Sequence, residues 1–509
     1  MGWAARSSRR LVLAIASAWV ATVYVAISPP IAVAIAPSYT NYPAPTASFT
    51  TPVGPGGLTF THSAKAGEPT IGVDRRTGAT IYQGGLYTYK VSWSGRTPPV
   101  ATWSDISPPA ALVAYRKSSD AFMYVDPETG RAFVTQLNGD CSVMDYTSND
   151  GATWTHSVLG CGIGSGFDHQ SLVGGRYANP APAHGADYPN NLYYCAQQEA
   201  GAGCARSDDG GNTFGVASQM YTTFGSVNPP AVTGRSSIAQ TGCIGMHGQP
   251  AIASDGTLYV PNRSCLYPAD TAVAEVQSVI RSDDNGRTWE PMPVKSPGWT
   301  KGACAAWCAT RQDESDPAVA VGSSGSVYFG WQEDTPSGGS AAKVSVSHDK
   351  GGSWSPPVNV SVSPSWAGVP INNVQFPAVV AGDDGRAAMS FLGTPSAGDD
   401  QSASFSAEWH LYIATTFDGG ASWSTVEATP GDPVQRGWIC MAGTSCTSGR
   451  NLLDFQDITI DARGLVQVAY ADGCIGACVL PTGTSASSTD ALLTIARQTA
   501  GRGLLSMYD

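Results

Sequence analysis

The sequence predicts an all-β protein built as a single β-propeller of seven blades. Three observations predict it: low charge with abundant Gly and Pro, a repeated pair of short apolar strands, and a repeated turn motif. Charged residues make up 13% of the 509 residues, whereas the chain holds 58 Gly and 35 Pro. This composition favours short strands joined by tight turns over amphipathic helices with charged faces.

Seven pairs of short apolar segments follow one another along the chain. In each pair, a strand suited to the inner edge of a blade is followed by a turn and a second strand. The pairs are 68–73 with 80–82, 120–125 with 132–134, 170–173 with 192–194, 249–252 with 258–260, 316–319 with 327–329, 376–379 with 387–389, and 456–459 with 465–468. Regular repeats of this kind are typical of propeller blades. Six blades remain the alternative, if the segment from Glu68 to Trp103 completes the last blade instead of forming its own.

The N-terminus has the pattern of a targeting segment. Arg6, Arg9 and Arg10 precede an apolar run over 11–27, and small residues at 32–34 suit a cleavage site. We therefore expect a signal peptide over 1–34 and a secreted protein, with an uncleaved N-terminal membrane anchor as the alternative. Residues 35–64 are rich in Ala, Pro, Thr and Ser and predict an extended spacer, so the propeller is expected over 65–509.

Twelve cysteines in an exported chain are expected to form disulfides, and they fall into pairs that are close in sequence. The expected pairs are Cys141–Cys161, Cys195–Cys204, Cys243–Cys265, Cys304–Cys308, Cys440–Cys446 and Cys474–Cys478. Zinc binding is the competing interpretation, but the two closest pairs lie far apart in the chain and an oxidising compartment favours disulfides. We expect neither a metal nor a cofactor.

A turn of the form Ser/Thr-x-Asp-x-Gly-x-Ser/Thr-aromatic recurs after most of the strand pairs. Its five copies are 147–154, 207–214, 282–289, 347–354 and 416–423. Each resembles the Asp box, or bacterial neuraminidase repeat, of sialidases and their propeller relatives. The first copy departs from the pattern, because Asn149 stands where the others have Asp.

The residue types of this turn point to a structural role. The Asp can accept backbone N–H groups within the turn, the Gly can adopt a positive φ, and the aromatic side chain can pack between blades. A calcium loop is the competing interpretation of 283–286, but the later bidentate Glu of an EF-hand is missing.

Propeller topology places the start of every inner strand and the end of every second strand on one face, opposite the repeated turns. On that face the sequence gathers carboxylates, imidazoles, amides and a Trp, which is typical of a sugar-binding cleft. Paired carboxylates suit glycoside hydrolysis, because one acid protonates the leaving oxygen and a second group acts as nucleophile or base. The candidate catalytic residues are Asp316, Asp457, Glu314 and Asp454, each of which could instead hold a loop by hydrogen bonds. The candidate substrate-binding residues are Asp168, His169, His247, Arg263, Trp331, Glu333, Gln375, Arg436 and Arg450.

The resemblance implies a sialidase-like glycoside hydrolase, yet the Arg-Ile-Pro motif of sialidases is absent and no arginine sits in a matching motif. We therefore expect either a secreted, exo-sialidase-like hydrolase of extracellular glycans or a non-catalytic propeller that binds a glycan or a protein. The net charge of −12 argues against nucleic acid as a partner. The expected partner is an extracellular carbohydrate or cell-wall glycan, and the expected state is a monomer.

Overall fold

The computed structural model describes residues 1–2, 36–53, 58–65, 67–95, 98–109, 120–138, 141–157, 166–183, 188–198, 201–222, 240–241, 243–268, 273–294, 315–336, 338–362, 370–480 and 491–509. The predicted signal peptide lies almost entirely outside these residues. Contacts divide the chain into two units, Met1–Ala34 and Ile35–Asp509. No helix within the described residues has the length and apolar character needed to cross a membrane.

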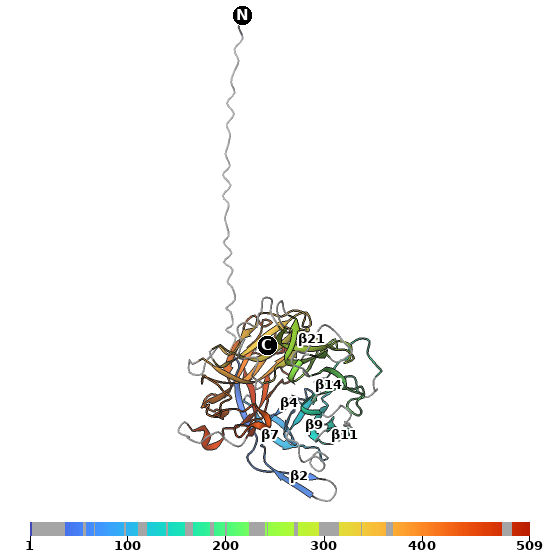
Figure 1. The fold of residues 1–509 in the computed structure, drawn as a ribbon, viewed down its shortest axis with the longest axis vertical. Helices are drawn as coiled ribbons and strands as arrows, with labels where there is room; N and C mark the ends of the chain where they lie inside the picture. Colours follow the sequence, from blue (N-terminus) through green and yellow to red (C-terminus); the bar gives the residue numbers. More distant parts are fainter. Residues whose placement is uncertain are drawn as a thin grey trace. The chain divides into compact units, whose positions relative to one another are not determined.

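The second unit is a propeller of seven sheets, antiparallel apart from one short parallel pairing in blade 3, which confirms the predicted fold class and blade count (Figure 1). The first four blades follow the chain in order. Blade 1 has β4 (Thr70–Val73), β5 (Thr80–Gly84), β6 (Tyr87–Ser94) and β7 (Val100–Asp105); blade 2 has β8 (Ala121–Val125), β9 (Ala132–Asn138), β10 (Cys141–Thr147) and β11 (Thr155–Ser157); blade 3 has β12 (Gly166–Gly175), β13 (Asn191–Gln198), β14 (Gly201–Ser207), β15 (Ser218–Thr222) and β16 (Gln240–Thr241); blade 4 has β17 (Cys243–His247), β18 (Ala251–Ile252), β19 (Leu258–Pro268), β20 (Val273–Ser282) and β21 (Glu290–Pro293).

The last three blades complete the ring. Blade 5 has β22 (Ala318–Val321), β23 (Val327–Asp334), β24 (Ser340–Ser347) and β25 (Val358–Asn359); blade 6 has β26 (Asn373–Ala381), β27 (Ala387–Thr394), β28 (Glu408–Thr416), β29 (Ser424–Glu427) and β30 (Gln435–Arg436); blade 7 has β31 (Asp457–Ile460), β32 (Val466–Asp472), β33 (Leu492–Ala500) and β1 (Ser38–Pro43). Short 3₁₀ turns lie at η2 (Gly443–Ser445), η3 (Gly476–Val479) and η4 (Ser506–Tyr508). Inner strands of neighbouring blades pack against one another, and β31 packs against β4.

The N-terminal part of the predicted spacer belongs to the propeller. Strand β1 pairs antiparallel with β33 and forms the outer strand of blade 7, although the sequence places it in residues 35–64. Residues further along this segment form a separate hairpin of β2 (Phe49–Val53) and β3 (Leu58–His62). The Ala, Pro, Thr and Ser content that predicts a spacer is also compatible with an edge strand, because such a strand has only one neighbour to pair with.

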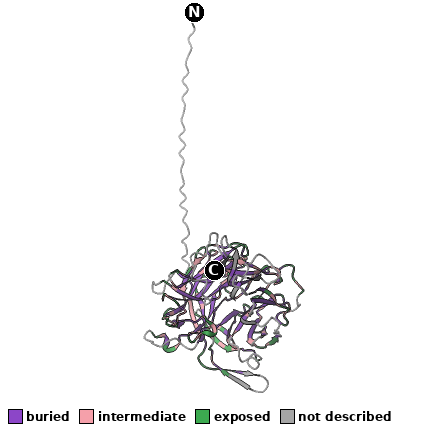
Figure 2. Ribbon diagram, in the orientation of Figure 1, coloured by how far each residue is buried: buried purple, intermediate pink, exposed green. Residues whose placement is uncertain are grey.

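The core lies between the blades, where the strands are buried over most of their length (Figure 2). Second strands carry a tyrosine in several blades, and these rings are almost fully buried: Tyr82, Tyr193, Tyr259, Tyr328 and Tyr470. Large rings suit these positions because neighbouring sheets diverge from the axis and leave space that only bulky side chains fill.

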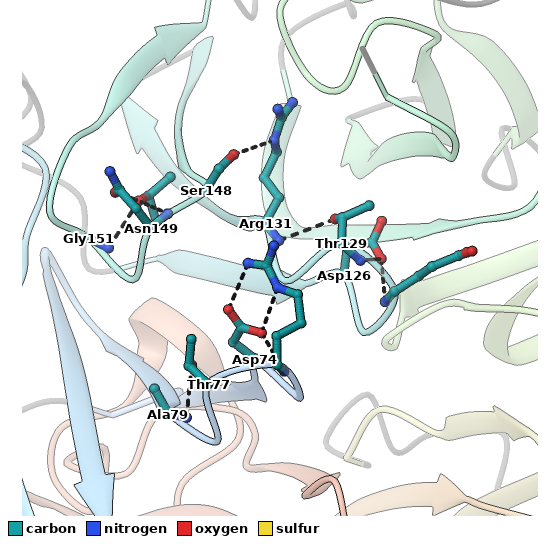
Figure 3. A network of polar contacts seen from close by, with 12 residues as sticks. Asp74, Thr77, Ala79, Asp126, Thr129, Arg131, Ser148, Asn149 and Gly151 are labelled. Carbon is teal, nitrogen blue, oxygen red and sulfur yellow. Dashed lines mark hydrogen bonds and ion pairs between the residues drawn. The ribbon is translucent and has the colours of Figure 1, made fainter. Parts of the chain in front are cut away.

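The five repeated turns, which we call the box turns, share one hydrogen-bond network. In each, the Gly backbone N–H donates to the first Ser or Thr side chain, with N···O distances of 2.8–3.0 Å. The φ of Gly151, Gly211, Gly286, Gly351 and Gly420 lies between 76° and 91°, which explains why Gly is needed there. Figure 3 shows the first box turn, in which Asn149 and Gly151 lie close to Ser148. Ser148 accepts a bond from Arg131, the residue before β9 (Nε···Oγ 2.9 Å).

Four of the six expected disulfides are present: Cys195–Cys204, Cys243–Cys265, Cys440–Cys446 and Cys474–Cys478. The first two join neighbouring strands within a blade, and the last two close short loops. Of the remaining pairs, Cys161, Cys304 and Cys308 lie outside the described residues, so those two disulfides stay predictions.

Candidate functional site

The starts of the inner strands in blades 1, 3, 5 and 7 bring four titratable side chains together at one end of the central channel. His169 lies between two carboxylates: its Nδ1 is 2.8 Å from Asp316 Oδ2 and its Nε2 is 3.9 Å from Asp454 Oδ2. Glu68 completes the group, because its Oε1 accepts the backbone N–H of Asp454 at 3.2 Å. With Arg450, these residues form what we call the mouth cluster.

Arg450 and Asp454 are joined by a bidentate ion pair, in which both guanidinium NH groups donate to the carboxylate. Both residues lie in the connection from blade 6 to blade 7, four positions apart. Burial acts to raise the pKa of Asp454, but the Arg450 bonds and the nearby His169 outweigh it and hold the pKa below its ordinary value. Asp454 is therefore ionised at neutral pH.

Glu68 behaves in the opposite way. Burial, followed by the negative charge of Asp454, raises its pKa well above the ordinary value. Its side chain is almost fully enclosed, with the residue 5% exposed. Glu68 and Asp454 thus form a pair of neighbouring carboxyl groups whose environments push their pKa values apart. In enzymes such a pair separates the group that keeps a proton from the group that stays ionised.

The backbone is strained at this end of the channel. Glu68 and His169 have φ values of 50° and 49°, and Leu453, beside Asp454, has 61°. Each is a non-glycine residue in the left-handed region, which costs on the order of 1–3 kcal/mol per residue. Strain of this kind persists only where surrounding contacts over-determine it, and it clusters at functional sites.

A small pocket of about 30 Å³ opens beside the cluster. Phe122 and Phe455 contribute apolar walls, while His169, Asp316, Gln170 and Gln456 contribute polar atoms. This volume holds one or two water molecules or a single small polar group. The described part of the pocket is therefore suited to one substituent of a ligand whose remainder lies outside it.

Asp457, a predicted catalytic residue, is held in other contacts. Its Oδ2 accepts the backbone N–H of Ile71 at 2.8 Å and its Oδ1 accepts that of Ile458 at 2.7 Å, so it joins blade 7 to blade 1. Burial raises its pKa to about 7, against the lowering effect of these bonds. A carboxylate with both oxygens committed to backbone groups acts as a structural link, and we leave Asp457 out of the proposed chemistry.

The predicted substrate-binding residues divide into three groups. His169 and Arg450 belong to the mouth cluster. A second group has contacts elsewhere in the protein: Trp331 Nε1 donates to Glu333 (3.3 Å) and Gln375 Nε2 donates to Asp400 (2.8 Å). Arg436 donates to Glu408 (2.7 Å) and to the Cys478 carbonyl (2.8 Å). Arg263 is half-buried and also has an interaction partner. Glu314 and the side chains of Asp168 and His247 lie outside the described part of the structure.

Sequence analysis missed Glu68, Gln170 and Gln456 as site residues. Glu68 lies in the first strand pair, which lacks a box turn and which the sequence identifies only as a blade. A signal was nevertheless present: Glu68-Pro69 and Asp316-Pro317 are the same X-Pro step at the start of an inner strand. Equivalent positions in a ring of blades lie near the axis, so Asp316 as a candidate predicts that Glu68 also faces the channel.

Among the described residues, no group of three or more His, Cys, Asp or Glu side chains is arranged to hold a metal ion.

No protein-family model and no curated protein matches this chain. Among solved structures, it is similar to the GH74 enzyme of Niastella koreensis, with 14% identity, TM-score 0.42, and coverage of 83% of this chain and 54% of that chain. It is similar to the α-L-arabinanase of Penicillium chrysogenum (12% identity, TM-score 0.41, 77% and 96% covered) and to a Hadza microbial sialidase (14%, 0.38, 83% and 73%). The chain thus spans about half the length of the Niastella enzyme. Similarity at this level identifies neither a family nor a substrate for this chain.

Proposed function

We propose that this protein is a secreted glycoside hydrolase that acts on extracellular glycans at the mouth cluster. The observation that carries the proposal is the placement of two carboxylates, Asp316 and Asp454, on either side of His169, with Glu68 beside them, whose pKa is raised by burial. Glycoside hydrolysis needs one group that donates a proton to the leaving oxygen and another that acts as base or nucleophile. The cluster supplies both kinds of group at one end of the channel.

The pKa shifts suggest how the roles are divided. Glu68, whose pKa is raised, suits the acid that protonates the leaving oxygen. Asp316 lines the pocket and is oriented by His169 Nδ1, so it suits the base or nucleophile. Asp454 is bonded through both oxygens to Arg450 and lies 3.9 Å from His169 Nε2, so it suits a group that positions His169.

Secretion is supported by the four disulfides and by the N-terminal targeting pattern. Disulfides persist in oxidising compartments and are rare in the cytosol. The resemblance of the box turns to Asp boxes would imply release of terminal sialic acid, but that activity needs cationic side chains that are free to bind the sugar carboxylate, so we do not include it in the proposal.

One observation favours a second candidate, a non-catalytic propeller that binds a glycan or a protein through the same face. The space beside the carboxylates is only about 30 Å³, and Glu68 and Asp454 are buried. A protein that only binds a ligand on this face does not need the ligand to reach these buried carboxyl groups. A hydrolase, in contrast, must bring a glycosidic oxygen within hydrogen-bond reach of the acid.

Chromogenic glycosides, including a sialoside, test the proposal when they are assayed with the wild type and with Asp316→Asn and Glu68→Gln. Either substitution keeps the shape of the side chain but removes its acid–base function, so we expect turnover to fall ~10²-fold or more. Asp284→Asn, in a box turn on the opposite face, is the matched control and should keep the wild-type rate. Wild-type turnover that survives both mouth substitutions would contradict the assignment, and a wild type without turnover on any glycoside would favour the binding propeller.

A further inference from the structure

We infer that the mouth site selects a sugar without negative charge, which presents hydroxyl or ammonium donors to the pocket, and that it rejects uronic and sialic acids. This inference rests on the proposed function, because it names the substrate class of the same site. Three independent features carry it: the engagement of the arginines, the charge of the cluster, and the kind of hydrogen-bonding atoms that the pocket presents.

The three arginines that the sequence offers as substrate-binding residues all lie in the described part of the structure, and each is engaged there by the protein. Arg450 forms its bidentate pair with Asp454, and Arg436 donates to Glu408 and to the carbonyl of Cys478. Arg263 has an interaction partner as well. The Nη1 and Nη2 groups of Arg450 are committed to Asp454, so an anionic sugar would have to compete with that carboxylate for them.

The cluster carries no excess of positive charge while both of its aspartates are ionised. Asp316 and Asp454 then contribute two negative charges, against the guanidinium of Arg450 and the imidazole of His169. The sum is zero when His169 is charged and Glu68 is protonated, and it is negative in the other protonation states of these two groups. The whole chain is also acidic, with a net charge of −12. A further carboxylate from the ligand would therefore be repelled at short range.

The pocket presents hydrogen-bond acceptors that lack donors. Gln170 Nε2 donates to the Asp120 carbonyl, which fixes the amide orientation and leaves Oε1 as the free end. Gln456 Nε2 donates to Ser390 Oγ at 3.1 Å. Both Oε1 atoms are buried and find no hydrogen-bond partner among the described residues, and both glutamines line the pocket. A buried acceptor without a donor destabilises the unliganded protein, so a ligand that donates to it gains affinity.

The size of the pocket indicates which part of the ligand the pocket recognises. About 30 Å³ admits one hydroxyl, hydroxymethyl or ammonium group but not a sugar ring. Selection therefore depends on a single substituent. A hydroxymethyl or amino group can donate to the Gln170 and Gln456 oxygens, whereas a carboxylate at the same ring position can only accept.

The test uses matched sets of 4-nitrophenyl glycosides that differ at one position: glucoside, glucosaminide and glucuronide, the corresponding galacto set, and a sialoside. Hydrolysis and binding, the latter by saturation-transfer NMR, are measured on the purified protein. We expect the neutral or amino member of one set to be preferred over its uronide by at least ~10-fold, a difference of about 1.4 kcal/mol. Preference for a uronide or the sialoside would overturn this inference and leave the proposed hydrolase intact, whereas no binding or turnover in any set would overturn both.

Two variants connect the selectivity to the named atoms. Asp454→Asn removes the carboxylate from Arg450 and should raise uronide binding relative to that of the neutral glycoside. Gln456→Met keeps the side-chain length but removes the acceptor, and it should weaken neutral-sugar binding several-fold without affecting the weak uronide binding. Thermal unfolding of each variant separates a folding defect from a change in selectivity. Unchanged ratios in both folded variants would contradict the inference.

Discussion

At the level of single residues, Asp316 and Asp457 show how surroundings decide the chemistry of a side chain. Both stand at the start of an inner strand, and the sequence gives them equal standing as catalytic candidates. Asp316 contacts His169 and lines the pocket, whereas Asp457 has both oxygens bonded to backbone N–H groups of two blades. The first is available to a ligand and the second is used by the fold.

Asp457→Asn is therefore expected to act on stability. The amide has one acceptor oxygen where the carboxylate has two, so one of the N–H groups of Ile71 and Ile458 loses its partner, at a cost of about 1–3 kcal/mol. Thermal unfolding should show a lower Tm, while the rate per folded molecule stays at the wild-type value. A stable but inactive Asp457→Asn protein would return this residue to the catalytic machinery.

Asp472, at the end of β32, gives a pH-dependent prediction. Burial, with the charge of Asp432, raises its pKa to about 8. An unfolded Asp ionises near pH 4, so ionisation of this group favours the unfolded chain and stability declines as the pH rises from about 4 to about 8. Asn cannot ionise, and its oxygen can still accept the Cys474 N–H at 3.0 Å. Asp472→Asn should thus raise the Tm clearly more at about pH 8.5 than at about pH 5; an equal shift at both pH values would contradict the raised pKa.

At the level of elements, the box turns show why one of them tolerates Asn. In the third copy, Asp284 Oδ1 accepts the Thr288 backbone N–H at 2.9 Å and Oδ2 accepts the Thr288 hydroxyl at 2.5 Å. In the first copy, Asn149 Oδ1 accepts the Thr153 N–H at 2.9 Å, and its Nδ2 donates to the Thr153 hydroxyl at 2.9 Å. A hydroxyl both donates and accepts, so the turn keeps its geometry with either residue.

A pair of substitutions at Asp284 tests this explanation. Asp284→Ala leaves the Thr288 N–H without an acceptor and should cost about 1–3 kcal/mol of unfolding free energy. Asp284→Asn reproduces the arrangement of the first copy and should cost clearly less. Chemical denaturation of both variants gives the two values, and equal losses would show that the negative charge, rather than the bonding geometry, holds the turn.

At the level of the whole molecule, the ring is closed by joining the two ends of the chain in one sheet. Blade 7 takes β31, β32 and β33 from the C-terminal part and β1 from the N-terminal part. This closure explains why the last repeat has no box turn: its third and fourth strands are not consecutive in sequence, so no hairpin connects them. Asn41 of β1 also donates to the Ala428 carbonyl at 2.9 Å, next to blade 6.

Truncation from the N-terminus tests the closure. Removing residues 1–35 leaves β1 in place and should leave the Tm unchanged. Removing residues 1–44 exposes the edge of β33 and deletes backbone hydrogen bonds worth about 1 kcal/mol each, so we expect a marked fall in Tm and association through the free edge. Thermal unfolding and size-exclusion chromatography measure both effects. Equal stability of the two truncated chains would mean that β1 contributes nothing to closure.

The sequence by itself determined the features that arise from local patterns. Alternating apolar strands, Gly at turns that need a positive φ, and cysteines close in sequence predict the blades, the box turns and four disulfides, because each depends on residues near one another in the chain. The two ends of the propeller ring depend on a pairing between Ser38–Pro43 and Leu492–Ala500, which no local pattern specifies.

The mouth cluster likewise depends on tertiary structure. Its members come from four blades, and only the closed ring places Glu68 next to Asp454 and His169 between Asp316 and Asp454. The sequence named Asp316, His169, Asp454 and Arg450 as candidates, and the fold brings these four together. It could not say that Arg450 is bonded to Asp454, or that burial raises the pKa of Glu68, because charge pairing and desolvation are set by neighbours that the fold supplies.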